Sequence, residues 1–558
     1  MSVILVFKNI VIVRICVLFF LKVISYMKKI REARVSDVEK IRDMFVQAYG
    51  NDYPFTGFYD TEWLKKAVYD DGTLFLVMEI NNEVMATASM MLTSGGLDDM
   101  IGEVGRLVAT PDMHFRGKGL FNELLETLVK RTSDRVQFLM AEARTPHPGS
   151  QRILEEMGWK VAGFEPLKYL VGIRESMVMY ASTQGMAMEL RRNNPRVIAE
   201  ASVLAQTVLK NMDFPVDVIV ENEVNGYPTE KDFNIEHLKD QQGISSLLRI
   251  ERGRVSNREI FGNFSLSHGF FRISDPRSNY LIARDGDAVL GAVGFSHDFI
   301  DRKVRIFELI EFDDAVKGAL LAAVDRIARE ELEVDYQEVD VSAYSPKIQR
   351  TFERLGFVPA AYCPSMVFEK VERLDVIRMA KLCRKYTPGP MRLLEAGKQM
   401  QKIVEKGFED RLIGMGISEA VQRTDLFNNL PDGDLYHLSR ISRFREYKSG
   451  TFLMKQGDEA GSLFILVSGE AEVIVDGKPA GTLREGRIIG EMALVDKGPR
   501  SADILLKKDC SVVEIEFQRL EHLMETYPQI GYSVGMNLAK SLSSKLRDSS
   551  AQNRTGRT

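Results

Sequence analysis

The sequence predicts a multidomain protein in which two α+β domains precede an all-β barrel with flanking helices. Three observations support this fold class. The chain has 558 residues, whereas single hydrophobic cores stop growing at about 250–300 residues. A segment that begins at Gln151 recurs at Gln349. After Leu426 the pattern changes to short apolar strands separated by glycine turns.

The apolar extension over residues 1–26 carries three charges, Lys8, Arg14 and Lys22. A membrane-spanning helix needs about 20 nearly uninterrupted apolar residues, and no small-residue cleavage site of a signal peptide follows. A second methionine, Met27, stands just before the first expected strand. We therefore expect translation to begin near Met27; a membrane or interfacial anchor is the alternative.

Residues 27–170 have the element order of an α+β domain. A strand (IREA) and a helix (VSDVEKIRDMFVQAY) are followed by the strands LFLVMEI and VMATASMML. Asn81 and Asn82 join these two strands, and Asn tolerates the left-handed backbone of a hairpin turn. The strand GEVGRLVA, a glycine-containing loop and the helix LFNELLETLVKR come next, and FLMAEAR, SQRILEEM and GWKVAGF complete the domain as strand, helix and strand.

Residues 240–375 are predicted to repeat this domain in a degenerate form. QRILEEMGWKVAGFEP (151–166) aligns with QRTFERLGFVPAAYCP (349–364), with the Gln-Arg pair, the glycine and the last proline in register. Two unrelated helices that each end at a glycine are the alternative explanation. We expect a helical connector over residues 171–239 and a helical linker over residues 376–424.

Residues 425–547 are predicted to form the all-β module with its helices, and residues 548–558 a disordered polar tail. The net charge of −5 gives no long-range attraction for nucleic acid or anionic membranes. No helix-turn-helix with a basic recognition helix follows the barrel, so nucleic-acid binding is not expected.

The cysteines and histidines also restrict the function. The four cysteines are far apart and form no CxxC pair, which favours free thiols in a reducing cytoplasm. The seven histidines are scattered, with no HExxH motif, so no metal site is expected.

The loop between a strand (106–109) and a helix (120–130) has the features of a pyrophosphate site. A helix N-terminus offers unpaired N–H groups and the positive end of its dipole. Gly117 and Gly119 allow close approach of the backbone to an anion, and Arg116 and Lys118 add positive charge.

Over about residues 28–170 the sequence resembles the GNAT acyl-CoA N-acyltransferases. Their signature, Gln/Arg-x-x-Gly-x-Gly/Ala, lies at this junction, with His114 at the Gln/Arg position of this sequence. The resemblance implies that acetyl-CoA is the co-substrate, that the loop backbone holds its pyrophosphate and that the preceding strand pairs with its pantetheine arm. The residues implied in acyl-CoA binding are Leu107, Val108, Ala109, His114, Phe115, Arg116, Gly117, Lys118, Gly119 and Leu120.

Transfer to an amine requires a deprotonated nucleophile and therefore a base. Glu103 lies fourteen residues before Gly117, and in several GNAT lysine acetyltransferases a glutamate at that spacing is the general base. Glu103 is the predicted catalytic residue; an ion-pair role is its structural alternative, and Glu142 on the next strand is the alternative base.

Many GNAT enzymes carry a tyrosine that protonates the leaving thiolate, in the helix before the final glycine-aromatic strand. This sequence has Leu154 at that position, with His147 and His114 as substitutes to consider. In the repeat the position is Phe352, and the loop residues Asp313 and Asp314 would repel a phosphate. We therefore expect residues 240–375 to have a structural or substrate-binding role.

The segments GEMAL (490–494) and PRSA (499–502) suit a cyclic phosphate. Small residues at the start of a short helix offer backbone donors, and Arg500 offers a forked pair of donors to phosphate oxygens. Glu491 can accept a hydrogen bond from the 2′-hydroxyl of a ribose.

These segments closely resemble the phosphate-binding cassette of cyclic-nucleotide-binding domains, and the resemblance covers about residues 426–547. Ile489 replaces the usual aromatic residue, and a cupin-like barrel that has lost its ligand is the alternative. We expect cAMP, although Ser501 does not distinguish it from cGMP. The residues implied in nucleotide contact are Gly490, Glu491, Met492, Ala493, Arg500, Ser501 and Ala502.

Together the patterns predict a cytoplasmic, cyclic-nucleotide-regulated N-acyltransferase that moves an acetyl group to an amine, with a protein lysine as the expected acceptor and a small amine as the alternative acceptor. The alternative is a non-catalytic sensor of both ligands that acts through partner binding. Leu154 and Phe352 favour the sensor, whereas Glu103 and the RGKG loop oppose it. A receptor tethered to a membrane through residues 1–26 is a third hypothesis.

Overall fold

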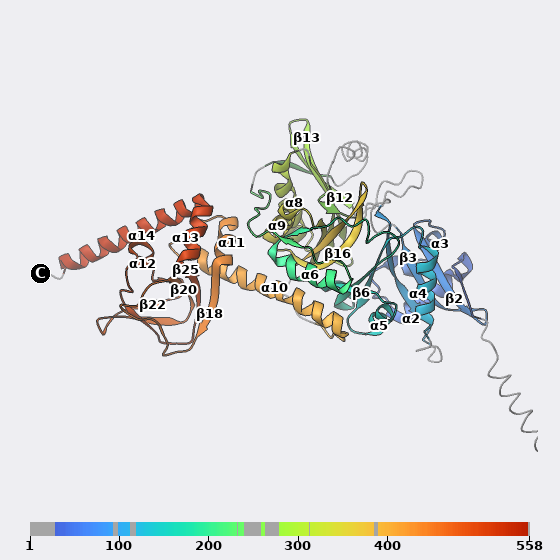
Figure 1. Cartoon of the computed structure of the whole chain (residues 1–558), viewed down its shortest axis with the longest axis horizontal. Helices are drawn as coiled ribbons and strands as arrows, with labels where there is room; N and C mark the ends of the chain where they lie inside the picture. Colours follow the sequence, from blue (N-terminus) through green and yellow to red (C-terminus); the bar gives the residue numbers. More distant parts are fainter. Residues whose placement is uncertain are drawn as a thin grey trace, which may run out of the picture. The chain divides into compact units, whose positions relative to one another are not determined.

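The computed structural model (Figure 1) divides the chain into two compact units, Met1–Glu405 and Lys406–Thr558. Residues 1–26, the loop residues His114–Lys118 and Phe312 lie outside the described residues, as do their predictions. The structure describes residues 28–92, 99–111, 119–230, 233–238, 258–262, 278–311, 313–383 and 389–555.

The first half of the first unit is a sheet with the strand order β1-β2-β3-β4-β5-β7-β6. β4 and β5 are parallel, and the other neighbours are antiparallel. Its strands are β1 (Lys28–Glu32), β2 (Thr73–Ile80), β3 (Glu83–Met91), β4 (Ile101–Ala109), β5 (Phe138–Arg144), β6 (Lys160–Val171) and β7 (Ile173–Thr183). Its helices are the short η1 (Val35–Asp37) and η2 (Thr56–Tyr59), and α2 (Val38–Tyr49), α3 (Thr61–Ala67), α4 (Leu120–Arg131) and α5 (Gly149–Glu156).

Helix α2 forms because its apolar residues recur at helical spacing and bury one face. Val38, Ile41 and Phe45 pack in one core cluster with Phe75 and Val77 of β2. The predicted hairpin between β2 and β3 is confirmed, since Asn81 and Asn82 have φ angles of 53° and 67°. A type I′ turn requires this left-handed backbone at both central residues.

The second half repeats the same strand order, β10-β12-β13-β14-β15-β17-β16, and β14 and β15 are again parallel. β16 pairs with β6 at Ala361 and Gly163, so the two halves form one continuous sheet. The strands are β10 (Asn234–Leu238), β12 (Ser278–Asp285), β13 (Ala288–Asp298), β14 (Lys303–Glu311), β15 (Tyr336–Ser342), β16 (Val358–Glu369) and β17 (Glu372–Leu382). Helices α8 (Asp314–Glu330) and α9 (Pro346–Arg354) correspond in order to α4 and α5, and β11 (Ile260–Phe261) adds to β15.

Two buried arginines make reciprocal contacts across this seam. Arg174 in β7 donates to two carbonyl groups of its own half and to the carbonyl of Asp301 in the other half. Arg373 in β17 likewise donates to two carbonyl groups of its own half and to the carbonyl of Asp99 in the first half. Asp99 and Asp301 precede β4 and β14, so the contacts follow an approximate two-fold symmetry.

Three predicted boundaries are wrong. The connector over residues 171–239 is largely not helical: β7 completes the first sheet, and α6 (Ala199–Asn211) is the one regular helix described within it, beside the short strands β8 (Arg196–Val197) and β9 (Ile219–Val220). β7 is buried on both faces, so its sequence lacks the polar-apolar alternation of a half-exposed strand.

The linker predicted over residues 376–424 begins later than expected, because β17 continues to Leu382 and α10 (Glu395–Gln422) starts thirteen residues further on. The tail predicted to be disordered from residue 548 continues the helix α14 (Pro528–Thr555) instead. Residues 548–555 contain neither Gly nor Pro, and the helix ends just before Gly556.

The second unit contains two four-stranded sheets of order β18-β25-β20-β23 and β19-β24-β21-β22. The predicted all-β module with flanking helices is confirmed. Its strands are β18 (Ser442–Tyr447), β19 (Phe452–Met454), β20 (Ser462–Ser468), β21 (Glu470–Val475), β22 (Lys478–Arg484), β23 (Ile488–Ile489), β24 (Asp503–Leu506) and β25 (Cys510–Glu516). Its helices besides α10 and α14 are α11 (Asp432–Ile441), α12 (Met492–Asp496) and α13 (Phe517–Thr526).

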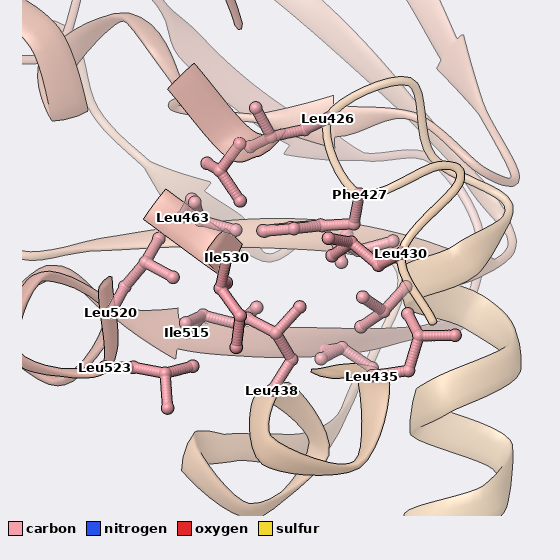
Figure 2. Packing of buried hydrophobic residues seen from close by; sticks show 14 of the residues in the cluster. Leu426, Phe427, Leu430, Leu435, Leu438, Leu463, Ile515, Leu520, Leu523 and Ile530 are labelled. Atoms are coloured by element: carbon pink, nitrogen blue, oxygen red, sulfur yellow. The ribbon is translucent and has the colours of Figure 1, made fainter. Parts of the chain in front are cut away.

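The helices of this unit pack on the strands β20 and β25 through one apolar cluster (Figure 2). Leu463 and Ile515 come from the strands, and Leu520 and Ile530 from α13 and α14. The last turns of α10 contribute Ile417, Ala420 and Val421 to the same cluster. None of the described helices is long and apolar enough to cross a membrane.

Candidate functional site

The parallel strands β4 and β5 separate partway along their length. They pair from Ile101 and Phe138 to Val104 and Ala141, but β4 continues to Ala109 and β5 to Arg144. In the described part of the chain no strand lies between the separated ends. The three predicted pantetheine residues at the end of β4 therefore line a wedge in which an amide-bearing arm could pair with the strand; they are Leu107, Val108 and Ala109.

Helix α4 begins at the same end of β4. Gly119 is its N-cap, with a left-handed φ of 68°, and Leu120 is its first residue. A Cβ at position 119 would have nothing within 4 Å, so glycine is present there for its backbone conformation. The first-turn N–H groups of α4 stand where the predicted pyrophosphate loop joins the helix.

Glu103 and Arg106 form an ion pair on β4, with 3.1 Å between Glu103 Oε1 and Arg106 Nη2. The side chain of Glu103 is 27% exposed, whereas that of Arg106 is 5% exposed and lies over the ring of Phe55. Arg106 Nη1 is buried without a hydrogen-bond partner among the described residues. Glu103 therefore makes the ion pair that was the structural alternative to a catalytic role, and Arg106 holds its carboxylate in place.

In the second half the corresponding wedge is filled by the chain itself. β14 and β15 pair from Lys303 to Ile306 of β14 and then separate, as β4 and β5 do. β11 pairs with the free end of β15, and a Cβ at Gly262 would lie 2.3 Å from Phe307 Cβ of β14. The segment Glu259–Gly262 therefore lies between the two strands.

A buried lysine fixes this segment. Lys317 of α8 is 6% exposed, and its Nζ lies 2.8 Å from Glu259 Oε2 and 3.1 Å from Glu311 Oε1. Tyr227 also donates its hydroxyl to Glu259. At the start of α8 the carboxylate of Asp313 accepts from the backbone N–H of Ala315, so an acidic side chain occupies the end of this helix.

In the second unit, Gly490 and Arg500 lie against each other. Gly490 has a φ of 87°, and a Cβ there would lie 2.3 Å from Arg500 Nη1. Arg500 is 7% exposed and donates through Nη2 to the carbonyl of Ser462 at 2.7 Å. Its Nη1 is buried and has no hydrogen-bond partner among the described residues. Burial lowers the pKa of Arg500, although Asp458 opposes this.

The other predicted nucleotide residues flank this pair. Glu491 is the N-cap of α12, and Ala493 is buried inside that helix. Met492 is 48% exposed, Ser501 is exposed and Ala502 is buried. The arrangement places a cation with an available donor beside the first turn of a short helix, which suits a small phosphate.

Two families match the chain. The family described as "Acetyltransferase (GNAT) family" matches residues 38–159, and the family described as "Cyclic nucleotide-binding domain" matches residues 444–527. The chain contains a GNAT domain and a cyclic nucleotide-binding domain. The resemblance noted in the sequence is thereby confirmed for these two regions. The GNAT match ends before the second half of the sheet, whose GNAT origin stays a prediction.

Similar proteins share part of the chain. Glutaminase 1 of Bradyrhizobium diazoefficiens is 34% identical over 122 residues, which are 22% of this chain and 20% of the glutaminase. The CRP-like protein Clp of Xanthomonas campestris is 29% identical over 132 residues, 22% of this chain and 57% of Clp. The chain thus covers less than two thirds of either relative.

Among solved structures, the cyclic nucleotide-binding domain from Methylobacillus flagellatus has 23% sequence identity and a TM-score of 0.24, and the match covers 27% of this chain and 86% of that domain. The catabolite activator protein of Thermus thermophilus has 24% identity and a TM-score of 0.22, covering 24% of this chain and 62% of that protein.

The alternative base of the GNAT domain, Glu142, is held in a buried ion-pair network. Its Oε1 lies 2.6 Å from Lys168 Nζ and 3.1 Å from Arg378 Nη1. Burial would raise the pKa of Glu142, but Lys168 and Arg378 outweigh burial and lower the pKa to about 2. A carboxylate with this pKa is a weak base.

His147 and His114 are the two histidines predicted as substitutes for the missing tyrosine. His147 is exposed, and its Nδ1 accepts from the backbone N–H of Gly149, the first residue of α5, at 3.0 Å. His114 lies outside the described residues. Leu154 is buried, in agreement with a packing role.

Sequence reasoning missed an aromatic wall beside Glu103 and Arg106. Tyr53 and Phe55 lie between α2 and α3, their rings 5.6 Å apart, and Tyr169 of β6 lies 6.0 Å from Phe55. Burial raises the pKa of Tyr53 against the opposing effect of Arg106, and burial raises the pKa of Tyr169. Both phenols therefore stay protonated at neutral pH. The aromatic-rich run YGNDYPFTGFY was the available signal.

Among the described residues, no group of three or more His, Cys, Asp or Glu side chains could hold a metal ion.

Proposed function

We propose that the GNAT domain transfers an acetyl group from acetyl-CoA to an amine, and that a cyclic nucleotide bound to the second unit regulates this transfer. The main support for the proposal is the difference between the wedge in the first half and the corresponding wedge in the second half. The wedge between β4 and β5 contains no described strand, whereas Glu259–Gly262 fills the wedge between β14 and β15. The first half therefore provides the acyl-CoA site, and the second half serves a structural role.

In the proposed reaction, Leu107–Ala109 pair with the pantetheine arm, and the loop His114–Lys118 with Gly119 and Leu120 holds the pyrophosphate. The amine nitrogen attacks the thioester carbonyl, the carbon–sulfur bond breaks, and CoA leaves as a thiolate that takes up a proton from solvent. Glu103 accepts the proton that the amine loses. Arg106 acts as a positioning residue for Glu103. A protein lysine is the proposed acceptor.

In the second unit, Arg500 Nη1 has no hydrogen-bond partner among the described residues, and Gly490 leaves room for the guanidinium that carries it; both features suit the binding of a cyclic phosphate. Arg500 would donate to phosphate oxygens, Glu491 would accept from the ribose 2′-hydroxyl, and Met492, Ala493, Ser501 and Ala502 would surround the phosphate. cAMP is the proposed ligand, with cGMP as the second candidate.

The cytoplasm is the proposed location. Cys363 and Cys510 are buried free thiols, and Cys383 is a partly buried one, which suits a reducing compartment.

Calorimetry of acetyl-CoA binding, with and without saturating cAMP, tests the proposal, together with CoA release in the presence of lysine peptides. We expect acetyl-CoA to bind, its affinity to change with cAMP and CoA to be released. Absence of acetyl-CoA binding in both conditions would overturn the enzyme proposal.

A non-catalytic sensor is the second candidate function, and the buried Leu154 at the tyrosine position favours it. The sensor predicts that both ligands bind and influence each other while no acceptor yields free CoA. An Arg500→Ala variant, which should lose cAMP binding, is the control for the nucleotide effect in either case.

A further inference from the structure

The segment that leads to the long helix α10 is held on the GNAT domain by a buried glutamine and by a backbone hydrogen bond. We call residues 389–394 the strap. The backbone N–H of Arg392 donates to the carbonyl of Thr145 at 2.7 Å. Gln151 of α5 is fully buried; its Nε2 donates to the carbonyl of Arg392 at 3.2 Å, and its Oε1 accepts from Leu394 N at 3.1 Å.

The same glutamine holds the end of β5, which is one wall of the acyl-CoA wedge. Gln151 Nε2 also lies 3.3 Å from the carbonyl of Arg144, the last residue of β5. Arg144 in turn makes two bonds to the carboxylate of Glu175, at 2.7 and 2.6 Å, and lies over the ring of Tyr49. A displacement of the strap would therefore change the hydrogen bonding of Gln151 and, through it, the position of the end of β5.

Helix α10 follows the strap directly, and the boundary between the two units lies within this helix. Near its start, Met400 and Val404 are buried within the first unit. Near its end, Ile417 and Val421 belong to the apolar cluster of the second unit shown in Figure 2. A change in the packing of that cluster thus acts on a helix that begins at the strap.

The second half contains the same arrangement, which we call the joint: a buried glutamine hydrogen-bonded to a segment that precedes a helix. In the second half this helix does not lead into the second unit. Gln349 of α9 accepts from Ile198 N at 3.0 Å and donates to the carbonyls of Arg196 and Ser342 at 3.1 and 2.9 Å. That segment leads into α6, which lies within the first unit. Gln349 is therefore an internal control for Gln151.

We propose that Gln151 is the positioning residue through which cyclic-nucleotide binding alters the acyl-CoA wedge. This inference rests on the proposed function. The nucleotide would bias the position of α10, and the strap and Gln151 would pass this bias to Thr145 and the end of β5. Coupling of this kind requires a contiguous set of contacts whose arrangement both ligands influence.

The test uses the full chain with Gln151→Leu and the control Gln349→Leu. Acetyl-CoA affinity is measured by calorimetry with and without saturating cAMP. We expect cAMP to change the affinity of the wild type and of Gln349→Leu by about fivefold or more. In Gln151→Leu both ligands should still bind, but the change should fall below about twofold. Wild-type coupling in Gln151→Leu, or an equal loss in Gln349→Leu, would overturn the inference.

A second measurement needs no variant. Hydrogen exchange at the amides of Arg392 and Leu394 is followed in the wild type with and without cAMP, and we expect their protection to change. Unchanged protection of these amides with cAMP bound would overturn the proposal that the strap and Gln151 transmit the effect of the nucleotide. Failure of the wild type to bind acetyl-CoA, with a cAMP-dependent change at these amides, would instead overturn the proposed function and leave the joint supported.

Discussion

A Cβ atom at position 490 would lie 2.3 Å from Arg500 Nη1, and Gly490 has a φ of 87°. Gly490→Ala should therefore displace the guanidinium and lower cAMP affinity about tenfold or more, measured by calorimetry. Gly450→Ala is the matched control, since Gly450 has a φ of 85° but nothing within 4 Å of its Cβ position. Equal losses in the two variants would mean that backbone strain, and not Arg500, accounts for the effect.

Glu103 gives the second prediction at the scale of residues. Glu103→Gln removes the proposed base and should lower kcat by about 10²–10⁴-fold while acetyl-CoA affinity stays close to that of the wild type. Glu79→Gln is the control, because Glu79 of the same sheet is also ion-paired to an arginine, 2.7 Å from Arg31. An unchanged kcat in Glu103→Gln would leave this residue with a structural role alone.

The buried network around Glu142 predicts acid sensitivity of the first unit. Lys168 and Arg378 lower the pKa of Glu142 to about 2 in the folded state, against about 4.3 in an unfolded chain. The network therefore stabilises the fold above about pH 4.3, and this contribution is lost as the pH falls toward 2. Nearby, burial raises the pKa of Glu165, so the contribution of Glu165 to the pH dependence of stability has the opposite sign to that of Glu142.

Urea unfolding at a series of pH values measures this dependence. Glu142→Gln should lower the free energy of unfolding at neutral pH by about 3 kcal/mol, because it removes one carboxylate from a buried network in which Lys168 and Arg378 also pair with Glu165, and it should flatten the decline between pH 4.3 and 2. Glu372→Gln breaks an exposed pair with Arg192 and should change neither quantity appreciably.

At the scale of elements, the position of β11 leads us to expect a single acyl-CoA site per chain. Because Glu259–Gly262 lies between β14 and β15, the second half has no open wedge for a pantetheine arm. Native mass spectrometry should find one acetyl-CoA per chain at saturation. Two per chain would show that β11 leaves its place and that the second half also binds the co-substrate.

The same elements show how far the sequence could be read. The helix at residues 38–49 and the hairpin at Asn81 and Asn82 follow from local spacing and turn chemistry, and the structure confirms them. β7 was missed because burial on both faces removes the alternation that marks a strand. β11 has two residues, and its place depends on a partner strand some eighty residues later, which no local pattern reveals.

The candidate sites divide in the same way. Glycine positions and charged residues in family signatures could be found by spacing, as at Gly490 and Arg500. The ion pair of Glu103 with Arg106, the aromatic wall and the joint at Gln151 could not, since each depends on side chains that tertiary packing brings together.

At the scale of the whole molecule, linkage gives a prediction that needs no acceptor. If cAMP changes the affinity for acetyl-CoA by some factor, saturating acetyl-CoA must change the affinity for cAMP by the same factor. Calorimetric titrations in the two orders measure both factors. Unequal factors would mean that a further equilibrium, such as self-association, is linked to one of the ligands.

The meeting of β6 and β16 at Gly163 and Ala361 has a consequence for fragments of this protein. A piece that ended after β7 would lack β16 and would leave the part of β6 around Gly163 as an uncovered sheet edge, which is a template for pairing with another chain. The approximate two-fold relation of the halves means that a second copy of the piece could offer the matching strand. In the intact chain the second half takes the place of such a partner, because its strand β16 pairs with β6.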